Sequence, residues 1–120
     1  MNKPEFEGGI NIALKVPKIH FQKTVEFYRD VLGFDVVEDL EQATPSYTCQ
    51  FGPNRLWIDM VENYSQTDVW LEIKTPNLEK ATEYLKQNNV PVRDELEPLP
   101  AGMKGHWISN PAGVVHLLIP

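Results

Sequence analysis

The 120-residue chain contains a single cysteine, Cys49, and no cluster of basic side chains. One cysteine excludes an internal disulfide and a cysteine-rich metal site, so a reducing cytoplasm is the expected location. No apolar run approaches the roughly 20 residues of a membrane-spanning helix, and the first residues lack the apolar stretch of a secretory signal. The 11 basic and 17 acidic residues give a net charge of −6. Since nucleic acids and anionic membranes attract mainly basic surfaces, neither is an expected partner.

Hydrophobic periodicity predicts a similar order of elements in both halves of the chain. In the first half, apolar residues alternate with polar ones up to Pro17, which is typical of a half-buried strand. In the second half the same alternation runs up to Pro76. The predicted elements of the first half are a strand (10–16), a helix (20–32) ending at Gly33, and strands over 34–38, 46–51 and 55–62. Those of the second half are a strand around 69–73, a helix that follows the N-cap Asn77 and ends at residues 88–89, and strands over 91–95, 106–109 and 114–119.

This repetition predicts an internal duplication. The expected fold class is α+β, with two tandem βαβββ modules. A chain of 120 residues suits one domain better than two independent ones, so a single domain is expected over residues 1–120. Module one is expected over about residues 8–63 and module two over about residues 67–120.

Three stretches resemble the glyoxalase/bleomycin-resistance/dioxygenase superfamily, also called vicinal oxygen chelate proteins. Residues 11–18 look like the first strand of that family, and residues 24–37 (TVEFYRDVLGFDVV) are very similar to its helix-to-strand segment. Residues 110–113 (NPAG) resemble the turn before its last strand. The likeness covers nearly the whole chain and implies paired βαβββ modules that form a curved mixed sheet around a cleft. It implies less about function, because the superfamily includes isomerases, lyases, ring-cleaving dioxygenases and non-catalytic antibiotic binders.

The resemblance also implies four metal-ligand positions that point into the cleft and usually carry His, Glu or Gln. They fall on Asn11, Asp59, Trp70 and either Leu117 or His116, depending on the length of the preceding turn. An indole nitrogen only donates hydrogen bonds and an amide is a weak ligand, so at best Asp59 and His116 remain, where a catalytic centre needs about three protein ligands. The expectation is therefore that no metal is bound. The alternative is a divalent ion such as Zn, Ni, Mn or Fe on Asp59 and His116.

Both of these residues have a second interpretation. A turn of the usual length points His116 toward the helix side of the sheet, whereas a turn one residue shorter points it into the cleft. Resemblance to bleomycin-resistance proteins, which carry a histidine at this place, favours the cleft. Asp59 alternates with apolar neighbours, so a solvated strand face accounts for it equally well. Cys49 alternates with aromatic residues and is expected to be buried rather than reactive.

Strand alternation places two tryptophans, two acidic residues and two lysines on the face opposite the helices. A mostly apolar wall with a few fixed polar groups suits a small molecule, and tryptophan faces beside acids suit an aromatic or cationic one. Large aromatic residues are also frequent at dimer interfaces, so the same face could close a dimer. The predicted ligand-binding residues are Asn11, Trp57, Asp59, Trp70, Glu72 and His116.

Three classes of function remain open. The predicted function is a small-molecule-binding protein of the superfamily that lacks the usual divalent metal and forms a homodimer. The alternative is a divergent metal-dependent lyase, isomerase or dioxygenase, in which Glu72 would move a proton. The third class is an interaction module that no longer uses its cleft.

Overall fold

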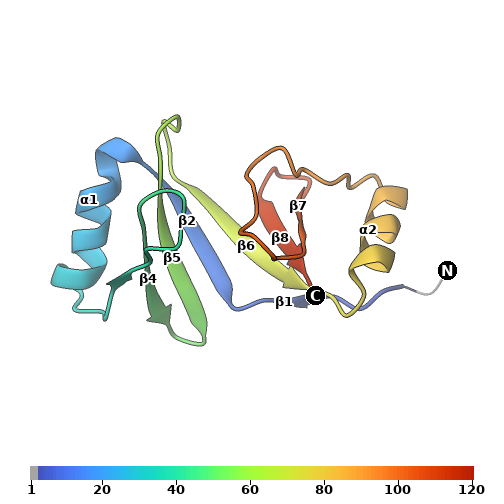
Figure 1. The fold of residues 1–120 in the computed structure, drawn as a ribbon, viewed down its shortest axis with the longest axis horizontal. Coiled ribbons are helices and arrows are strands. Elements are labelled where there is room, and N and C mark those ends of the chain that lie inside the picture. Colours follow the sequence, from blue (N-terminus) through green and yellow to red (C-terminus); the bar gives the residue numbers. More distant parts are fainter. Residues whose placement is uncertain (1–2) are drawn as a thin grey trace. The chain divides into compact units, whose positions relative to one another are not determined.

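The computed structural model describes residues 3–120, which form two compact units (Figure 1). The first unit is Ile10–Trp70, and the second joins Leu71–Pro120 to residues 3–9. Each unit packs one helix against β-strands, which confirms the expected α+β class. Met1 and Asn2, which the predicted 1–120 domain includes, lie outside the described residues.

The sheet of the first unit is built around strand β2, where the alternation of apolar residues is clearest. Its elements are β2 (Asn11–Pro17), helix α1 (Lys18–Glu26) with the π-helical turn η1 (Phe27–Val31), β3 (Val37–Glu38), β4 (Ser46–Phe51), β5 (Asn54–Val61) and the start of β6 (Asp68–Lys74). Strand β2 pairs in parallel with β5 and antiparallel with the first residues of β6. Strand β4 pairs antiparallel with β5 and with β3.

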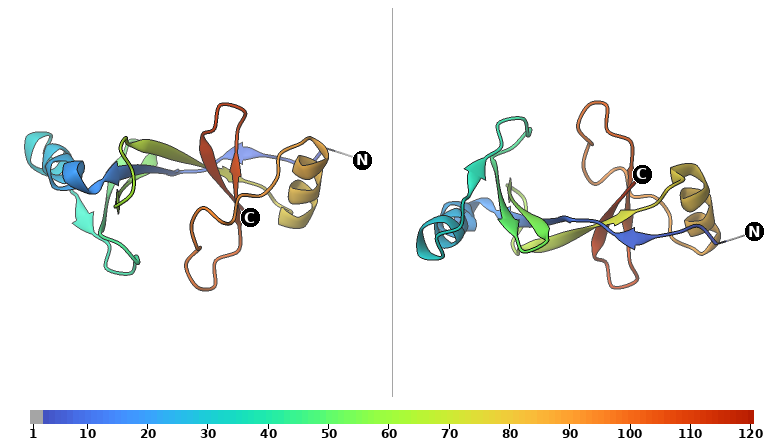
Figure 2. Two further views of the ribbon diagram at one scale, coloured as in Figure 1. Left: turned by 90° about the horizontal axis from the view of Figure 1, so that it is seen from above. Right: turned by 90° about the horizontal axis from the view of Figure 1, so that it is seen from below.

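The core of the first unit lies between α1 and this sheet. Phe21 and Val25 of α1 pack against Val16 and Ile58, and each of these four side chains is at most 6% exposed. Burial of side chains of this size contributes about 1.5–3 kcal/mol each. The helix ends at Gly33, whose φ of +75° suits a residue without a side chain, as the sequence predicts. In both views of Figure 2 the loop between β3 and β4 extends away from α1.

The second unit repeats the helix-on-sheet arrangement with different strands. It contains β1 (Glu7–Gly8), the end of β6, helix α2 (Leu78–Gln87), β7 (His106–Ser109) and β8 (Val115–Ile119). Strand β8 pairs in parallel with β6 and antiparallel with β7, and β1 pairs antiparallel with β6. Ala81 of α2 packs against Ile108 and Leu118. The Asn77 side chain accepts a hydrogen bond from the Lys80 backbone N–H at 3.0 Å, which confirms the predicted N-cap.

The predicted strand over residues 91–95 is wrong, because this segment forms no ladder. The Arg93 backbone N–H donates a hydrogen bond to the Trp107 carbonyl oxygen, but the Trp107 N–H donates to a side chain and not to a backbone carbonyl oxygen. The Asp94 carboxylate accepts from the Trp107 backbone N–H at 3.0 Å and replaces the main-chain acceptor that a strand would supply. Pro91 has no N–H to donate. The strand predicted over 34–38 is shorter than expected, since only Val37 and Glu38 pair with β4.

Two further observations concern the division of the chain into units and the character of its helices. The first unit extends to Trp70 because residues 68–70 pair with β2, so β6 contributes to both units. The single-domain organisation and its module boundaries stay a prediction. Within residues 3–120, no helix has the length and apolar character needed to cross a membrane.

Candidate functional site

The face of the first sheet that points away from α1 carries most of the predicted site residues. Val16 of β2 and Ile58 of β5 contact α1, so the residues that alternate with them point to the other side. We call this side the distal face and define it by its side chains. They include Asn11, Ala13, Lys15, Ser46, Thr48, Gln50, Arg55, Trp57, Asp59, Asp68 and Trp70. The predicted residues Asn11, Trp57, Asp59 and Trp70 therefore share one face.

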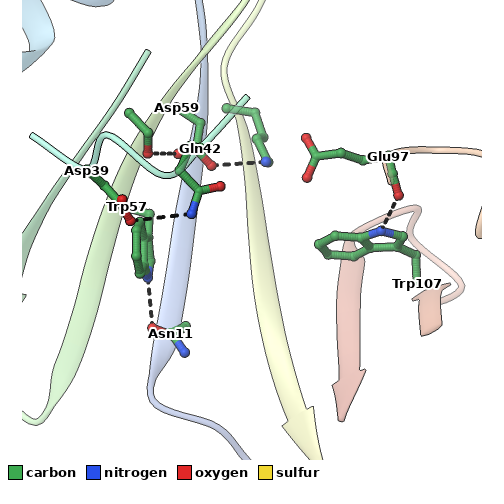
Figure 3. Close-up of polar contacts among 9 residues, drawn as sticks. Asn11, Asp39, Gln42, Trp57, Asp59, Glu97 and Trp107 are labelled. Carbon is green, nitrogen blue, oxygen red and sulfur yellow. Dashed lines mark hydrogen bonds and ion pairs between the residues drawn. The ribbon is translucent and has the colours of Figure 1, made fainter. Parts of the chain in front are cut away.

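Two tryptophans flank an alanine in one row across this face. Ala13 pairs with Trp57 on one side and with Trp70 on the other. Neighbouring strands are about 4.8 Å apart, so the two tryptophan Cα atoms are about 10 Å apart, with Ala13 between them. Trp57 donates from Nε1 to Asn11 Oδ1 at 2.8 Å, which fixes its ring (Figure 3). We call this arrangement the Trp57–Ala13–Trp70 row.

The next row is charged, and its polar atoms are held by one another. Lys15 Nζ lies 3.0 Å from Asp59 Oδ2, and the Ser46 hydroxyl donates to Asp59 Oδ1. The same ammonium lies 4.4 Å from the centroid of the Trp70 ring, a cation–π distance. Lys15 is 4% exposed, Ser46 1% and Trp70 4%. Burial of a lysine is costly unless the charge is paired, and here a carboxylate and an aromatic face both meet it.

The second unit has a smaller distal face of its own. Glu72 of β6 pairs with Leu117 of β8, which pairs with Trp107 of β7, so these three side chains form a row. Glu72 and Trp107 are both buried. Trp107 donates from Nε1 to the Glu97 carbonyl oxygen at 2.8 Å, which ties the proline-containing loop over residues 97–102 (EPLPAG) to the sheet of this unit (Figure 3). A Cβ at Gly9 would overlap the Glu72 side chain, so a larger residue at this position would force that side chain to move.

His116 points to the helix side of the second sheet. It pairs with Ile108 of β7, and both Ile108 and Leu118 belong to the core beneath α2. Side chains of paired residues share a face, so His116 lies with this core, while Leu117 lies with Glu72. This is the placement expected for a turn of the usual length before β8, so the cleft orientation of His116 that the resemblance favours is wrong. His116 Nδ1 is 3.0 Å from the Val114 carbonyl oxygen.

The side chains at the four implied metal positions do not form a donor set for a divalent ion. Asp59 pairs with Lys15, four residues along β2 from Asn11, which separates the two positions by about 13 Å at 3.3 Å per residue. Trp70 offers no lone pair, and Leu117 takes the fourth position. Among residues 3–120, no three His, Cys, Asp or Glu side chains are grouped closely enough to hold a metal ion.

The remaining reactive side chains lie away from the distal face. Cys49 is buried on the α1 side, and burial raises the pKa of its thiol, so it matches the expected small buried residue. His106 Nδ1 lies 2.7 Å from Asp94 Oδ2 at the start of β7. Trp107, Ala13 and Lys15 were not among the predicted site residues. Strand alternation places Ala13 and Lys15 on the distal face, but only the pairing register shows which side chains they meet.

A model of the Glyoxalase/Bleomycin resistance protein/Dioxygenase superfamily matches residues 14–116. The chain belongs to this superfamily. Solved structures similar to this superfamily member include methylmalonyl-CoA epimerase from Mycobacterium tuberculosis, with a TM-score of 0.63, 17% identity, and coverage of 93% of this chain and 86% of that one. A variant of homoprotocatechuate 2,3-dioxygenase from B. fuscum has a TM-score of 0.65 at 17% identity, with 97% of this chain and 33% of that chain covered.

The Mn(II)-bound glyoxalase from Novosphingobium aromaticivorans has a TM-score of 0.56 at 17% identity, with 90% of this chain and 36% of that chain covered. At these identities the likeness concerns the fold. A search of curated proteins finds no match. The family match and the structural similarity together confirm the glyoxalase-like α+β fold that the sequence predicts.

Proposed function

We propose that this superfamily member is a metal-free small-molecule-binding protein that holds its ligand on the distal face of the first unit. The observation that carries the proposal is the Trp57–Ala13–Trp70 row beside the Lys15–Asp59 ion pair. The half-buried Trp57 indole beside the Ala13 methyl group offers apolar contact to a flat molecule, and the neighbouring polar row can orient it. We also propose that the protein forms a homodimer, as expected from the sequence.

The predicted site residues have different roles in this proposal. Trp57 contacts the ligand, Asn11 fixes the Trp57 ring and Asp59 holds the polar row in place. Ligand contact by Trp70 stays a prediction, because its ring is 4% exposed and lies beneath the Lys15 ammonium. Contributions of Glu72 and His116 to ligand binding stay predictions, and the placement of His116 with the α2 core disfavours its contribution.

A divergent metal-dependent lyase, isomerase or dioxygenase is the alternative. Its support is that the similar structures include a dioxygenase and a Mn(II)-bound glyoxalase. Such an enzyme would use Asp59 and His116 as ligands. The ion pair that occupies Asp59 and the helix-side placement of His116 favour the metal-free protein.

The proposal is tested by screening planar aromatic compounds for an increase in melting temperature, in the presence and absence of EDTA. A compound that stabilises the protein is then titrated against Ala13→Leu, which places a larger side chain beside Trp57 on the distal face. We expect Ala13→Leu to weaken binding by about tenfold or more, and EDTA to have no effect. The matched control is Ala112→Leu, in an exposed turn.

Two results would contradict this proposal. If EDTA abolishes binding, the ligand is held through a metal. If Ala13→Leu and Ala112→Leu both bind the compound with the affinity of the wild-type chain, the Trp57–Ala13–Trp70 row is not the binding surface.

A further inference from the structure

A site suited to a cation lies on the distal face, and the chain fills it with its own lysine. Asp59 provides a carboxylate, Trp70 provides the face of an indole, and Lys15 Nζ meets them at 3.0 Å and 4.4 Å. Carboxylates and tryptophan faces are the two groups that most often hold organic ammonium ions. We call Asp59, Ser46 and Trp70 together the ammonium seat.

The ammonium seat is built into the sheet rather than formed by mobile surface groups. Its three members come from β5, β4 and β6, and Lys15 reaches them from β2. Ser46 holds one carboxylate oxygen of Asp59 while Lys15 holds the other. Lys15, Ser46 and Trp70 are each more than nine-tenths buried. The position of the carboxylate is therefore set by the strands, whichever cation meets it.

We infer that Lys15 is a tethered cation that closes the ammonium seat to ligand cations and so restricts the protein to ligands without an ammonium group at this point. The inference rests on the proposed function and narrows its ligand class. It also departs from the expectation that Trp70 and Asp59 would hold a cationic ligand, since Lys15 already contacts both. A free amine would have to displace a lysine whose effective concentration at the seat is set by the chain itself.

The matching experiment removes the tethered ammonium and returns it as a free ion. Lys15→Ala deletes three methylene groups and the ammonium, which together correspond to n-propylammonium. The melting temperature of Lys15→Ala is measured with increasing n-propylammonium chloride, against equal concentrations of sodium chloride and of n-propanol. The wild-type chain and Lys15→Arg, which keeps a charge at the seat, are measured in the same way.

We expect n-propylammonium to stabilise Lys15→Ala alone. A tenfold excess over its dissociation constant should raise the melting temperature by about 5 °C for a chain of this length, whereas sodium chloride and n-propanol should not. Adding Asp59→Asn to Lys15→Ala should remove the effect, because the carboxylate of the seat is gone. If Lys15→Ala does not fold, refolding yield with n-propylammonium against sodium chloride replaces the melting temperature.

Two results would overturn the inference. In one, n-propylammonium stabilises the wild-type chain and Lys15→Ala to the same extent; in the other, it has no effect on Lys15→Ala. Neither result would affect the proposed function, which is judged separately by EDTA and by Ala13→Leu on the wild-type background. Conversely, loss of ligand binding in EDTA would refute the metal-free proposal. It would not account for a stabilisation by n-propylammonium that is limited to Lys15→Ala.

Discussion

Replacing Lys15 by methionine should destabilise the fold more than any loss of a surface charge. Methionine keeps most of the aliphatic length of lysine but leaves Asp59 without its cation. The Lys15 side chain is 6% exposed and that of Asp59 17%, so the pair is largely withdrawn from water. Removal of one partner of a buried ion pair costs about 3–5 kcal/mol. Because Asp59 keeps the Ser46 hydroxyl and some contact with water, we expect the lower limit, about 3 kcal/mol.

This loss is measured by urea unfolding followed by circular dichroism at pH 7. It corresponds to a decrease in melting temperature of about 12 °C, given an unfolding entropy of about 2.1 cal/mol/K per residue. The double variant Lys15→Met/Asp59→Asn removes the orphaned charge and should recover at least about 1 kcal/mol.

Lys18→Met is the matched control for this experiment. Lys18 pairs with Glu62 at 3.9 Å, but both side chains are about two-thirds exposed, 68% and 67%. Exposed pairs contribute little, so this variant should unfold close to the wild-type midpoint. The reasoning fails if Lys15→Met and Lys18→Met cost the same, or if the double variant is no more stable than Lys15→Met.

Two further predictions concern the second helix and the buried thiol. Asn77→Ala removes the N-cap of α2 and should lower the free energy of unfolding by about 1 kcal/mol in the same urea assay; an unchanged midpoint would mean that the cap does not hold the helix. Burial raises the pKa of the Cys49 thiol, so the folded chain should react with a disulfide reagent at pH 8 far more slowly than the chain in urea, and equal rates would show that the thiol is accessible. The pKa of the Cys49 thiol is higher in the folded chain than in the unfolded chain, so the thiol stabilises the fold fully at a pH below its unfolded pKa. This contribution to the free energy of unfolding is lost as the pH rises through the folded pKa. Cys49→Ala should remove this pH dependence.

The two faces of the first sheet could be predicted from the sequence because side chains alternate along a strand. That rule places Asn11 and Lys15 on one face of β2, and Trp57 and Asp59 on the same face of β5. It does not say which residues meet. The register that sets Lys15 opposite Asp59 depends on contacts between strands more than 40 positions apart, so the ion pair emerges only from the folded chain.

The second half of the chain shows why other predictions were less reliable. The strand expected over 91–95 does not form, since the Asp94 side chain competes with the backbone for the Trp107 N–H. The face occupied by His116 depends on a single residue in the turn before β8, which alternation within the strand does not determine. By contrast, the N-cap at Asn77 and the left-handed residue Gly33 are local features, and the sequence predicts both correctly.

The central claim, a superfamily member that works without a divalent metal, is tested most directly by the metal content of the purified protein. The untagged chain, prepared without chelators, is analysed for Zn, Ni, Mn and Fe against protein concentration. We predict far less than one ion per chain, because Asp59 is already paired with Lys15 and residues 3–120 contain no group of three His, Cys, Asp or Glu side chains that could hold a metal ion. About one divalent ion per chain, retained through dialysis, would contradict the account and would make the metal-dependent enzyme the better description.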